Sequence, residues 1–163
     1  MSEPVVRWLE GAIRSDWSIL ELGSGASSVW FASLGGRLLS LEHDPDWYRS
    51  SKADIEAAGV TNADLSLCPR QEFTKRLGEL EGDSFELVVV DHLDGEGLDR
   101  ARSVELVHSL VKPGGYLLLD DSDRPRYGGV DAVLSGWERR RFVGLKGYPP
   151  AFAVESTVFR RPQ

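Results

Sequence analysis

The sequence predicts an α/β fold: a doubly wound, mostly parallel seven-stranded sheet that ends in an antiparallel C-terminal hairpin. Five short apolar segments alternate with segments of helical periodicity, which is the pattern of consecutive βα units. The segment 85–90 is β-branched and apolar on both faces, as in the centre of a parallel sheet. The last two apolar segments, 142–146 and 153–160, have no helix between them and therefore predict a hairpin.

The length and composition are those of a single domain, 1–163. A chain of 163 residues buries roughly two thirds of its unfolded surface, and 28% charged with 41% hydrophobic residues is an ordinary globular balance. No apolar run approaches the roughly 20 residues that span a bilayer, and Met1-Ser2-Glu3-Pro4 lacks the pattern of a signal peptide. We therefore expect a cytoplasmic protein without a membrane partner.

The charge and the cysteine content exclude further classes of protein. A net charge of −7 argues against a nucleic-acid partner, because such binding relies on many Lys and Arg contacts to phosphate. Cys68 is the single cysteine, so the sequence has no internal disulfide and no cysteine-rich zinc site, and we expect this side chain to be buried. Arg139-Arg140-Arg141 is the one basic cluster, and we interpret it as the exposed end of a helix.

The N-terminal half alternates helices and strands. Apolar residues on one face predict a helix over 5–13 after Pro4, and apolar runs predict strands over 17–22 and 38–41. A helix containing 29–32 connects these two strands. Asp44 is expected to cap the helix that runs from Pro45 to about Ala58, and Gly59 is expected to end it.

The C-terminal half continues the alternation. We predict strands over 63–67, 85–90 and 116–119, and helices over 71–80, 98–111 and 127–137. The turn Gly82-Asp83 ends the first of these helices, and Pro113-Gly114-Gly115 ends the second. The third contains three glycines, which disfavour it. The connection Gly147-Tyr148-Pro149-Pro150 is expected to form the turn of the final hairpin.

The chain is organised around the turn Gly23-Ser24-Gly25, between the first strand and its helix. Its two glycines allow backbone angles closed to other residues and let a ligand approach the main chain. Ser27 or Ser28 is expected to cap the helix, whose free N–H groups favour a carboxylate or phosphate. A dinucleotide fingerprint needs a third glycine where the chain has Ser28, so the turn does not indicate an NAD site. Glu42, at the end of the second strand, is placed to bind both hydroxyls of an adenosine ribose.

Two segments resemble motifs of the class I S-adenosylmethionine-dependent methyltransferases, which have a Rossmann-like core. Glu21-Leu22-Gly23-Ser24-Gly25-Ala26-Ser27 is similar to their first motif, E-x-G-x-G-x-S, and Leu41-Glu42-His43-Asp44-Pro45 is similar to their second. The resemblance extends more weakly over nearly the whole chain. It implies that the turn holds the methionine end of the cofactor, that Glu42 holds the ribose and that His43 lies on the adenine. The residues expected to bind S-adenosylmethionine are Glu21, Gly23, Ser24, Gly25, Ser27, Ser28, Glu42, His43, Arg70, Gln71, Asp91 and His92.

Acidic residues at the strand ends are candidates for the chemistry. Glu42, Asp91 and Asp120-Asp121 all follow predicted strands, so a parallel sheet brings them to one crevice. Asp91 could face the cofactor's amino group, act as general base or cap the following loop. His92 could be a base with a pKa near neutral, whereas the family resemblance implies a packing role beside the cofactor. Trp47 is interpreted as a core residue, with a position over the ribose as the alternative.

Asp91-His92 and Leu119-Asp120-Asp121 also resemble the catechol O-methyltransferase branch of the family, which holds a magnesium ion at such positions. The resemblance implies Asp91, Asp120 and Asp121 as ligands of Mg²⁺, and three carboxylates suit an octahedral divalent cation. Asp94 departs from the pattern, because that branch has its lysine base there. The aspartates could instead cap loops and helices.

We interpret the chain as an S-adenosylmethionine-dependent methyltransferase that acts on an oxygen of a small-molecule or sugar-like acceptor. Two alternatives stay open: a catalytically silent S-adenosylmethionine-binding subunit of a partner enzyme, and transfer of another group from a related nucleoside. The sequence has no insertion large enough to cover an acceptor, so the acceptor site is either open or completed by a second subunit. A homodimer would use the N-terminal helix and the aromatic segment 148–152.

Overall fold

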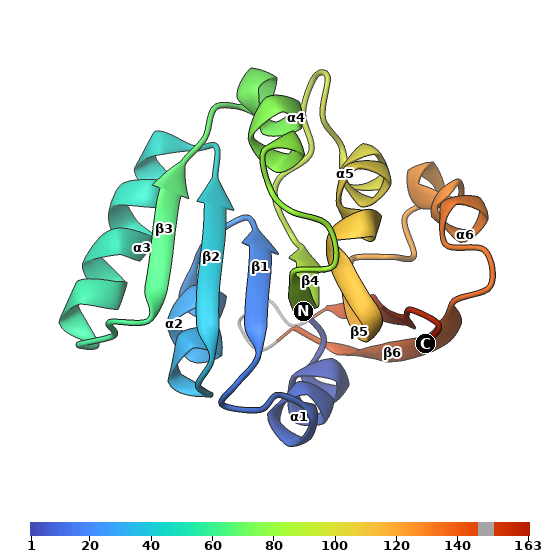
Figure 1. The fold of residues 1–163 in the computed structure, drawn as a ribbon, viewed down its shortest axis with the longest axis horizontal. Coiled ribbons are helices and arrows are strands. Elements are labelled where there is room, and N and C mark those ends of the chain that lie inside the picture. Colours follow the sequence, from blue (N-terminus) through green and yellow to red (C-terminus); the bar gives the residue numbers. More distant parts are fainter. Residues whose placement is uncertain (147–151) are drawn as a thin grey trace.

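The computed structural model describes residues 1–146 and 152–163. Seven strands form one sheet in the order β3-β2-β1-β4-β5-β7-β6, with helices on both of its faces (Figure 1). Strands β1 to β5 are parallel, and β7 runs antiparallel to both β5 and β6. The predicted fold class, a doubly wound and mostly parallel sheet with a C-terminal antiparallel hairpin, is confirmed.

The elements follow the predicted alternation along the chain. The strands are β1 (Ser18–Leu22), β2 (Arg37–Glu42), β3 (Ala63–Leu67), β4 (Phe85–Val90), β5 (Val111–Asp120), β6 (Glu138–Leu145) and β7 (Ala153–Arg160). The helices are α1 (Glu3–Ala12), α2 (Ala26–Ser33), α3 (Pro45–Ala57), α4 (Arg70–Gly78), α5 (Arg100–Val107) and α6 (Val130–Val133), with the 3₁₀ turns η1 (His108–Leu110) and η2 (Pro125–Tyr127).

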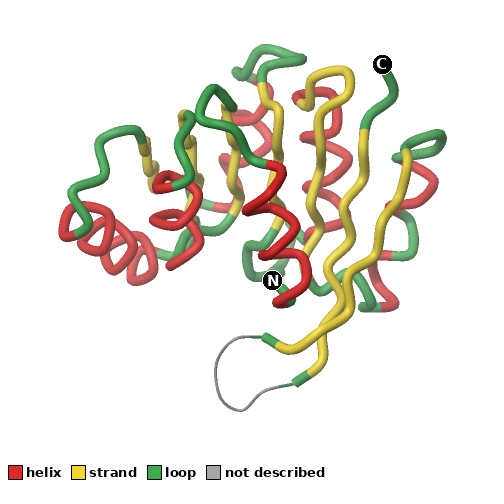
Figure 2. Tube along the Cα trace, turned by 90° about the horizontal axis from the view of Figure 1, so that it is seen from below, coloured by secondary structure: helices red, strands yellow, loops and turns green. Residues whose placement is uncertain are grey.

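Two apolar layers fix the helices on the sheet. Figure 2, seen from below, shows helices on both sides of the row of strands. On one face, α1 and α2 pack with Leu87 and Val89 of β4, and on the other face α4, α5 and α6 pack with Val88 and Val90. Alternate residues of a strand point to opposite faces, and both faces are covered here, so β4 is apolar at nearly every position.

Several local signals act as the sequence predicts. The Asp44 side chain caps α3, because its Oδ1 accepts hydrogen bonds from the N–H groups of Asp46 (2.8 Å) and Trp47 (3.0 Å). The helix ends before Gly59, as expected. Cys68 is free and buried, which agrees with its interpretation as a small core residue.

The predicted helix over 98–111 is too long at both ends. Helix α5 covers only Arg100–Val107, η1 follows, and β5 already begins at Val111, so Pro113-Gly114-Gly115 lies inside a strand. Val111 pairs with Phe85 and Tyr116 pairs with Leu87, which leaves the residues between them as a bulge. A bulge accommodates proline and glycine within a strand, and Gly114 adopts a φ of 76° there.

The region between β5 and β7 also differs from the prediction. In place of a helix over 127–137, the structure has η2 and the single turn of α6, interrupted by glycines. Arg139-Arg140-Arg141 lies in the edge strand β6 and not at a helix end. Arg139 and Arg141 pair with Asp131 (2.6 Å) and Glu155 (3.5 Å) on one face of that strand. Residues 139–141 are extended because they form backbone hydrogen bonds with β7, and this pairing depends on residues distant in sequence.

Part of the predicted hairpin is outside the described residues. The expected turn 147–150 lies there, as does most of the expected partner surface 148–152, of which Phe152 alone is described and is exposed. Among the helices that the structure describes, none combines the length and the apolar character needed to cross a membrane.

Candidate functional site

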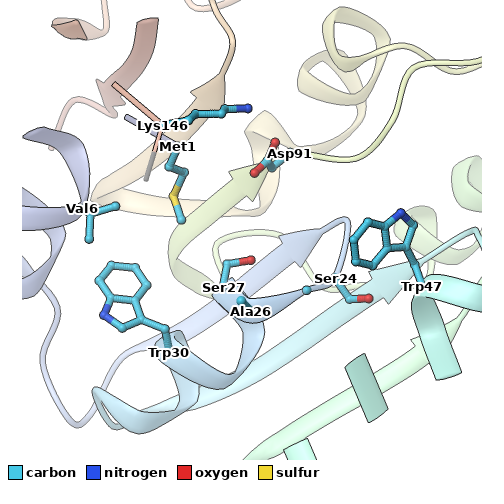
Figure 3. Close-up of a pocket in the computed structure, with 10 residues that line it drawn as sticks. Met1, Val6, Ser24, Ala26, Ser27, Trp30, Trp47, Asp91 and Lys146 are labelled. Carbon is cyan, nitrogen blue, oxygen red and sulfur yellow. The ribbon is translucent and has the colours of Figure 1, made fainter. Parts of the chain in front are cut away.

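The candidate site lies at the carboxyl ends of the parallel strands, where the strand order reverses between β1 and β4. Two adjoining cavities, of about 500 and 240 Å³, share Ser24, Trp47, Asp91 and Lys146 in their linings and are therefore parts of one site. The larger is also lined by Met1, Val6, Gly25, Ala26, Ser27 and Trp30 (Figure 3). The smaller is also lined by Gly23, Glu42, His92, Leu93, Arg100, Asp121 and Arg124.

The glycine turn is shaped by the close approach of β1 and β4. Gly23 has a φ of 96°, and a Cβ there would lie 2.6 Å from Cα and 2.7 Å from N of His92. At Gly25, no atom of residues 1–146 and 152–163 lies within 4 Å of the corresponding position, and the residue lines the larger cavity. The N-cap of α2 is Gly25, not Ser27 or Ser28 as expected, and Oγ of Ser28 accepts the N–H of Gly25 (3.1 Å). The two glycines therefore have different roles. Gly23 allows the backbone at the end of β1 to lie against the His92 backbone, and Gly25 leaves room for a ligand.

Glu21 lies beneath this turn and is completely buried. Its carboxylate accepts hydrogen bonds from the hydroxyls of Ser27 (2.5 Å), Ser28 (2.5 Å) and Ser40 (2.8 Å). Burial raises the pKa of Glu21 to about 7, although the serine hydroxyls oppose the shift. These contacts brace the turn from below, and the direct cofactor contact expected of Glu21 and Ser28 stays a prediction.

We expect Glu21→Gln to flatten the pH dependence of stability. Folding raises the pKa of this carboxyl from 4.5 to about 7, so the folded state holds the proton more tightly than the unfolded state. The free energy of unfolding therefore falls as the pH rises between these two values. The free energy of unfolding falls by about 3 kcal/mol in total: none of this is lost below the unfolded-state pKa, and all of it is lost above the folded-state pKa. Denaturant unfolding at about pH 4 and about pH 8 measures it. The exposed control Glu10→Gln should keep the wild-type slope, and the same slope in Glu21→Gln would contradict the prediction.

Glu42 ends β2 and connects the turn after β1 to the loop after β2. Its Oε2 accepts the N–H (2.7 Å) and the hydroxyl (3.2 Å) of Ser24, and its Oε1 accepts the N–H groups of His43 (2.7 Å) and Asp44 (2.8 Å). Four donors fill the usual capacity of a carboxylate. A ribose hydroxyl would therefore take the place of the Ser24 hydroxyl, whose bond is the longest of the four.

The three residues expected on the adenine side line neither cavity. The imidazole of His43 packs at the edge of the Phe73 and His92 rings, with centroids 6.3 and 6.1 Å away, and its Nε2 lies 2.5 Å from Nη2 of Arg70. Arg70 also donates to the carbonyl of Leu93 (3.0 Å) and so ties α4 to the loop after β4. Gln71 is exposed on the first turn of α4. Their adenine contacts stay predictions.

Asp91 and His92 both follow β4 but have different surroundings. His92 is buried, its Nδ1 lies 2.9 Å from the carbonyl of Leu93, and its Nε2 lies 2.7 Å from the hydroxyl of Ser103. Burial lowers the pKa of His92 to about 4, so the ring is neutral and both nitrogens are engaged, which fits packing better than base catalysis. Asp91 lines both cavities, and burial together with the charge of Asp120 raises its pKa to about 6. Of these two candidates, Asp91 is better placed to accept a proton.

Arg100 is not among the residues predicted from the sequence, yet it joins the ends of β4 and β5. Its buried guanidinium donates to the carbonyls of His92 (2.8 Å), Asp120 (2.6 Å) and Asp91 (3.2 Å). It also lies 3.0 Å from Oδ1 of Asp91 and 3.4 Å from Oδ2 of Asp121. A sequence signal was present, because Arg100 falls one helical turn before the buried Val104 and so on the apolar face of α5.

The three aspartates expected to bind Mg²⁺ come together, but they do not fit a metal. Asp120 accepts a hydrogen bond from Ser156 (2.6 Å) and is paired with the Met1 ammonium (2.9 Å) and with Lys146 (3.1 Å). Asp121 is paired with Lys146 (2.9 Å), with Arg124 and with Arg100, and Asp91 also with Arg100. Within 1–146 and 152–163, no three His, Cys, Asp or Glu residues are arranged to hold a metal ion. Ammonium and guanidinium groups supply the positive charge that the prediction gave to Mg²⁺.

Two further residues near the cavities, Trp47 and Asp94, have other surroundings than the sequence predicts. Trp47 is not a core residue, since it is 52% exposed and lines both cavities from the first turn of α3. Asp94, at the position of the lysine base in the catechol branch, accepts hydrogen bonds from the Tyr127 hydroxyl and the Arg100 N–H (3.0 Å) and pairs with Arg126 (2.6 Å). Asp94 therefore anchors its loop.

A doubly wound sheet with antiparallel β7, a glycine turn after β1 and an acid at the end of β2 defines the class I methyltransferase fold. Residues 20–122 match the model of the family described as "Methyltransferase domain". The chain belongs to this methyltransferase family. The family predicted from the two sequence motifs is confirmed.

Solved structures with the same fold include two methyltransferases and a protein in complex with AdoMet. The O-methyltransferase from Bacillus cereus in complex with SAH has a TM-score of 0.76 at 16% identity, covering 99% of this chain and 82% of that one. Precorrin-6y C5,15-methyltransferase from Geobacter metallireducens GS-15 has a TM-score of 0.72 at 16% identity, covering 96% and 86%. TYW2 of M. jannaschii in complex with AdoMet has a TM-score of 0.67 at 10% identity, covering 98% and 75%. No match was found among curated protein sequences.

Proposed function

We propose that the chain is a cytoplasmic S-adenosylmethionine-dependent methyltransferase that methylates an oxygen of a small molecule, sugar-like compounds included. The observation that carries this proposal is the continuous site at the strand ends, in which Gly25, the β2-end acid Glu42 and Asp91 line adjoining cavities. The larger cavity, about 500 Å³, leaves room for a small acceptor beside the methionine end of the cofactor at Gly25. The O-methyltransferase of Bacillus cereus, which binds SAH on the same fold, supports the cofactor and the reaction type.

The residues present fit this cofactor. When bound, S-adenosylmethionine supplies a methyl group on a cationic sulfur, which an acceptor oxygen can attack in line. Gly23, Ser24 and Gly25 would receive the methionine end, and Glu42 would orient the ribose. Asp91 would favour the nearby positive charge and accept the proton of the acceptor hydroxyl, since a pKa of about 6 leaves it mostly ionised at neutral pH.

Calorimetric titration with S-adenosylhomocysteine, S-adenosylmethionine and NAD tests the proposal. We expect the first two to bind and NAD not to bind. Glu42→Ala should weaken S-adenosylhomocysteine binding roughly 10- to 100-fold, because the charge-assisted hydrogen bond to the ribose is lost. Glu56→Ala, on the exposed side of α3, is the matched control and should bind like the wild type. Unchanged affinity in a folded Glu42→Ala chain would refute the position of the cofactor.

The same titration separates the alternatives. Cofactor binding without transfer by the pure chain, with transfer restored by a partner protein, would support a silent subunit. Binding of a related nucleoside in preference to S-adenosylmethionine would support transfer of another group. A homodimer stays a prediction, which the mass of the particle in solution tests directly.

A further inference from the structure

Lys146 brings a fixed positive charge to the wall that the two cavities share. It follows the last residue of β6, and its N–H donates to the carbonyl of Phe152 (3.2 Å). Its Nζ lies 2.9 Å from Oδ1 of Asp121 and 3.1 Å from Oδ2 of Asp120, while 18% of its side chain stays exposed. Figure 3 shows the ammonium group beside Asp91 at the cavity. The charge is therefore held in place and is accessible to a ligand.

The ammonium group keeps hydrogen-bonding capacity for that ligand. Its Nζ lies within 3.1 Å of one carboxylate oxygen of Asp121 and one of Asp120, so two of its partners are already fixed. An ammonium has three N–H donors. The two carboxylates leave a donor of the Lys146 ammonium free for an acceptor oxygen of a ligand.

The neighbouring arginines are already engaged. Arg100 directs its guanidinium at three backbone carbonyls, and Arg124 pairs with Asp121 and Asp94. Both line the smaller cavity, whereas Lys146 lines the smaller and the larger one. Lys146 is therefore the side-chain cation of the described site that reaches the part expected to hold the acceptor.

The opposite wall of the larger cavity is aromatic and apolar. Trp30 and Val6 lie across the cavity from Asp91 and Lys146 (Figure 3). The indole of Trp47 closes another side and is half exposed. A ligand that packs against Trp30 and also binds Lys146 has a flat apolar body and carries its negative charge at one end.

We propose that Lys146 binds the deprotonated oxygen of the methyl acceptor, and that the acceptor is an acidic aromatic hydroxyl compound such as a phenol. This inference rests on the proposed function and narrows it. A fixed ammonium stabilises an oxyanion by a charge-assisted hydrogen bond without needing a metal ion, which agrees with the ion-paired state of the aspartates. Neutral sugar hydroxyls ionise far less readily and gain less from this charge.

The binding of para-nitrophenol tests the proposal without requiring turnover, because only its phenolate form is strongly coloured. Wild-type protein saturated with S-adenosylhomocysteine is titrated with the dye across a pH series, with and without EDTA. We expect the bound dye to ionise about one pH unit below the free dye, which is about a tenfold preference for the phenolate. EDTA should leave the shift unchanged. A shift that EDTA abolishes would overturn the proposal.

Variants of Lys146 identify the source of the shift. Lys146→Met should abolish it, Lys146→Arg should keep most of it because the charge remains, and the exposed control Lys52→Met should match the wild type. Thermal unfolding confirms that each variant is folded. No shift in wild-type protein that binds S-adenosylhomocysteine, or an equal shift in Lys146→Met, would overturn this inference alone. Failure of the wild type to bind S-adenosylhomocysteine would overturn the proposed function and this inference with it.

Discussion

Replacing Arg100 with methionine is expected to destabilise the folded chain by about 3 to 5 kcal/mol, the usual cost of removing one partner from a buried ionic network. Methionine fills a similar volume but donates nothing, so the carbonyls of His92 and Asp120 lose their partner at the ends of β4 and β5. The carboxylates of Asp91 and Asp121 lose a neighbouring positive charge as well. Urea unfolding at neutral pH measures the loss.

The control for this variant lies on the same helix. Arg102 is exposed and, among the described residues, its side chain pairs with Glu105 of α5 across one turn, so Arg102→Met should cost less than about 1 kcal/mol. Arg100→Lys should be intermediate, because an ammonium keeps the charge but cannot reach three carbonyls in different directions. A chain in which Arg100→Met and Arg102→Met lose equal stability would show that the buried network does not hold the strand ends together.

Arg100 also shows what the sequence could and could not predict. Strands β1 and β4 and the cap at Asp44 follow from local patterns, because a buried parallel strand is mostly apolar and a helix needs a polar cap. The convergence of Gly23, Glu42 and Asp91 followed from one rule of parallel sheets. The identity of their partners did not, since a guanidinium from α5 and an ammonium from the end of β6 reach the site through tertiary packing.

The charges at the site also depend on tertiary packing that the sequence does not reveal. Asp91, Asp120 and Asp121 were expected to share a cation, and they do lie together at the ends of β4 and β5. Sequence spacing cannot tell which cation neutralises them, because Lys146 comes from the C-terminal hairpin. The interpretation of Arg139-Arg140-Arg141 as a helix end was wrong for a related reason: pairing along β7 extends β6 over these residues.

Substitutions at the two glycines of the turn are expected to affect different properties: the stability of the fold at Gly23 and ligand binding at Gly25. In Gly23→Ala the new Cβ would lie 2.6 Å from Cα of His92, at a φ of 96°, and no flexible side chain can move to make room. Backbone strain and overlap together should cost on the order of 3 kcal/mol or more. Urea unfolding should show this loss, and S-adenosylhomocysteine binding should disappear with the shape of the turn.

Gly25→Ala should have the opposite profile. Its φ of 164° is extended and a Cβ would meet no atom of the described residues within 4 Å, so stability should change by less than about 1 kcal/mol. The methyl group would instead stand beside the larger cavity, where the cofactor's methionine end is proposed to approach the main chain, and should weaken S-adenosylhomocysteine binding about tenfold or more. Gly11→Ala, at the far end of α1 with similar open space, controls for the added methyl and should leave binding unchanged. Full affinity in a stable Gly25→Ala chain would mean that the ligand does not lie against this turn, because the described residues leave room for a side chain there.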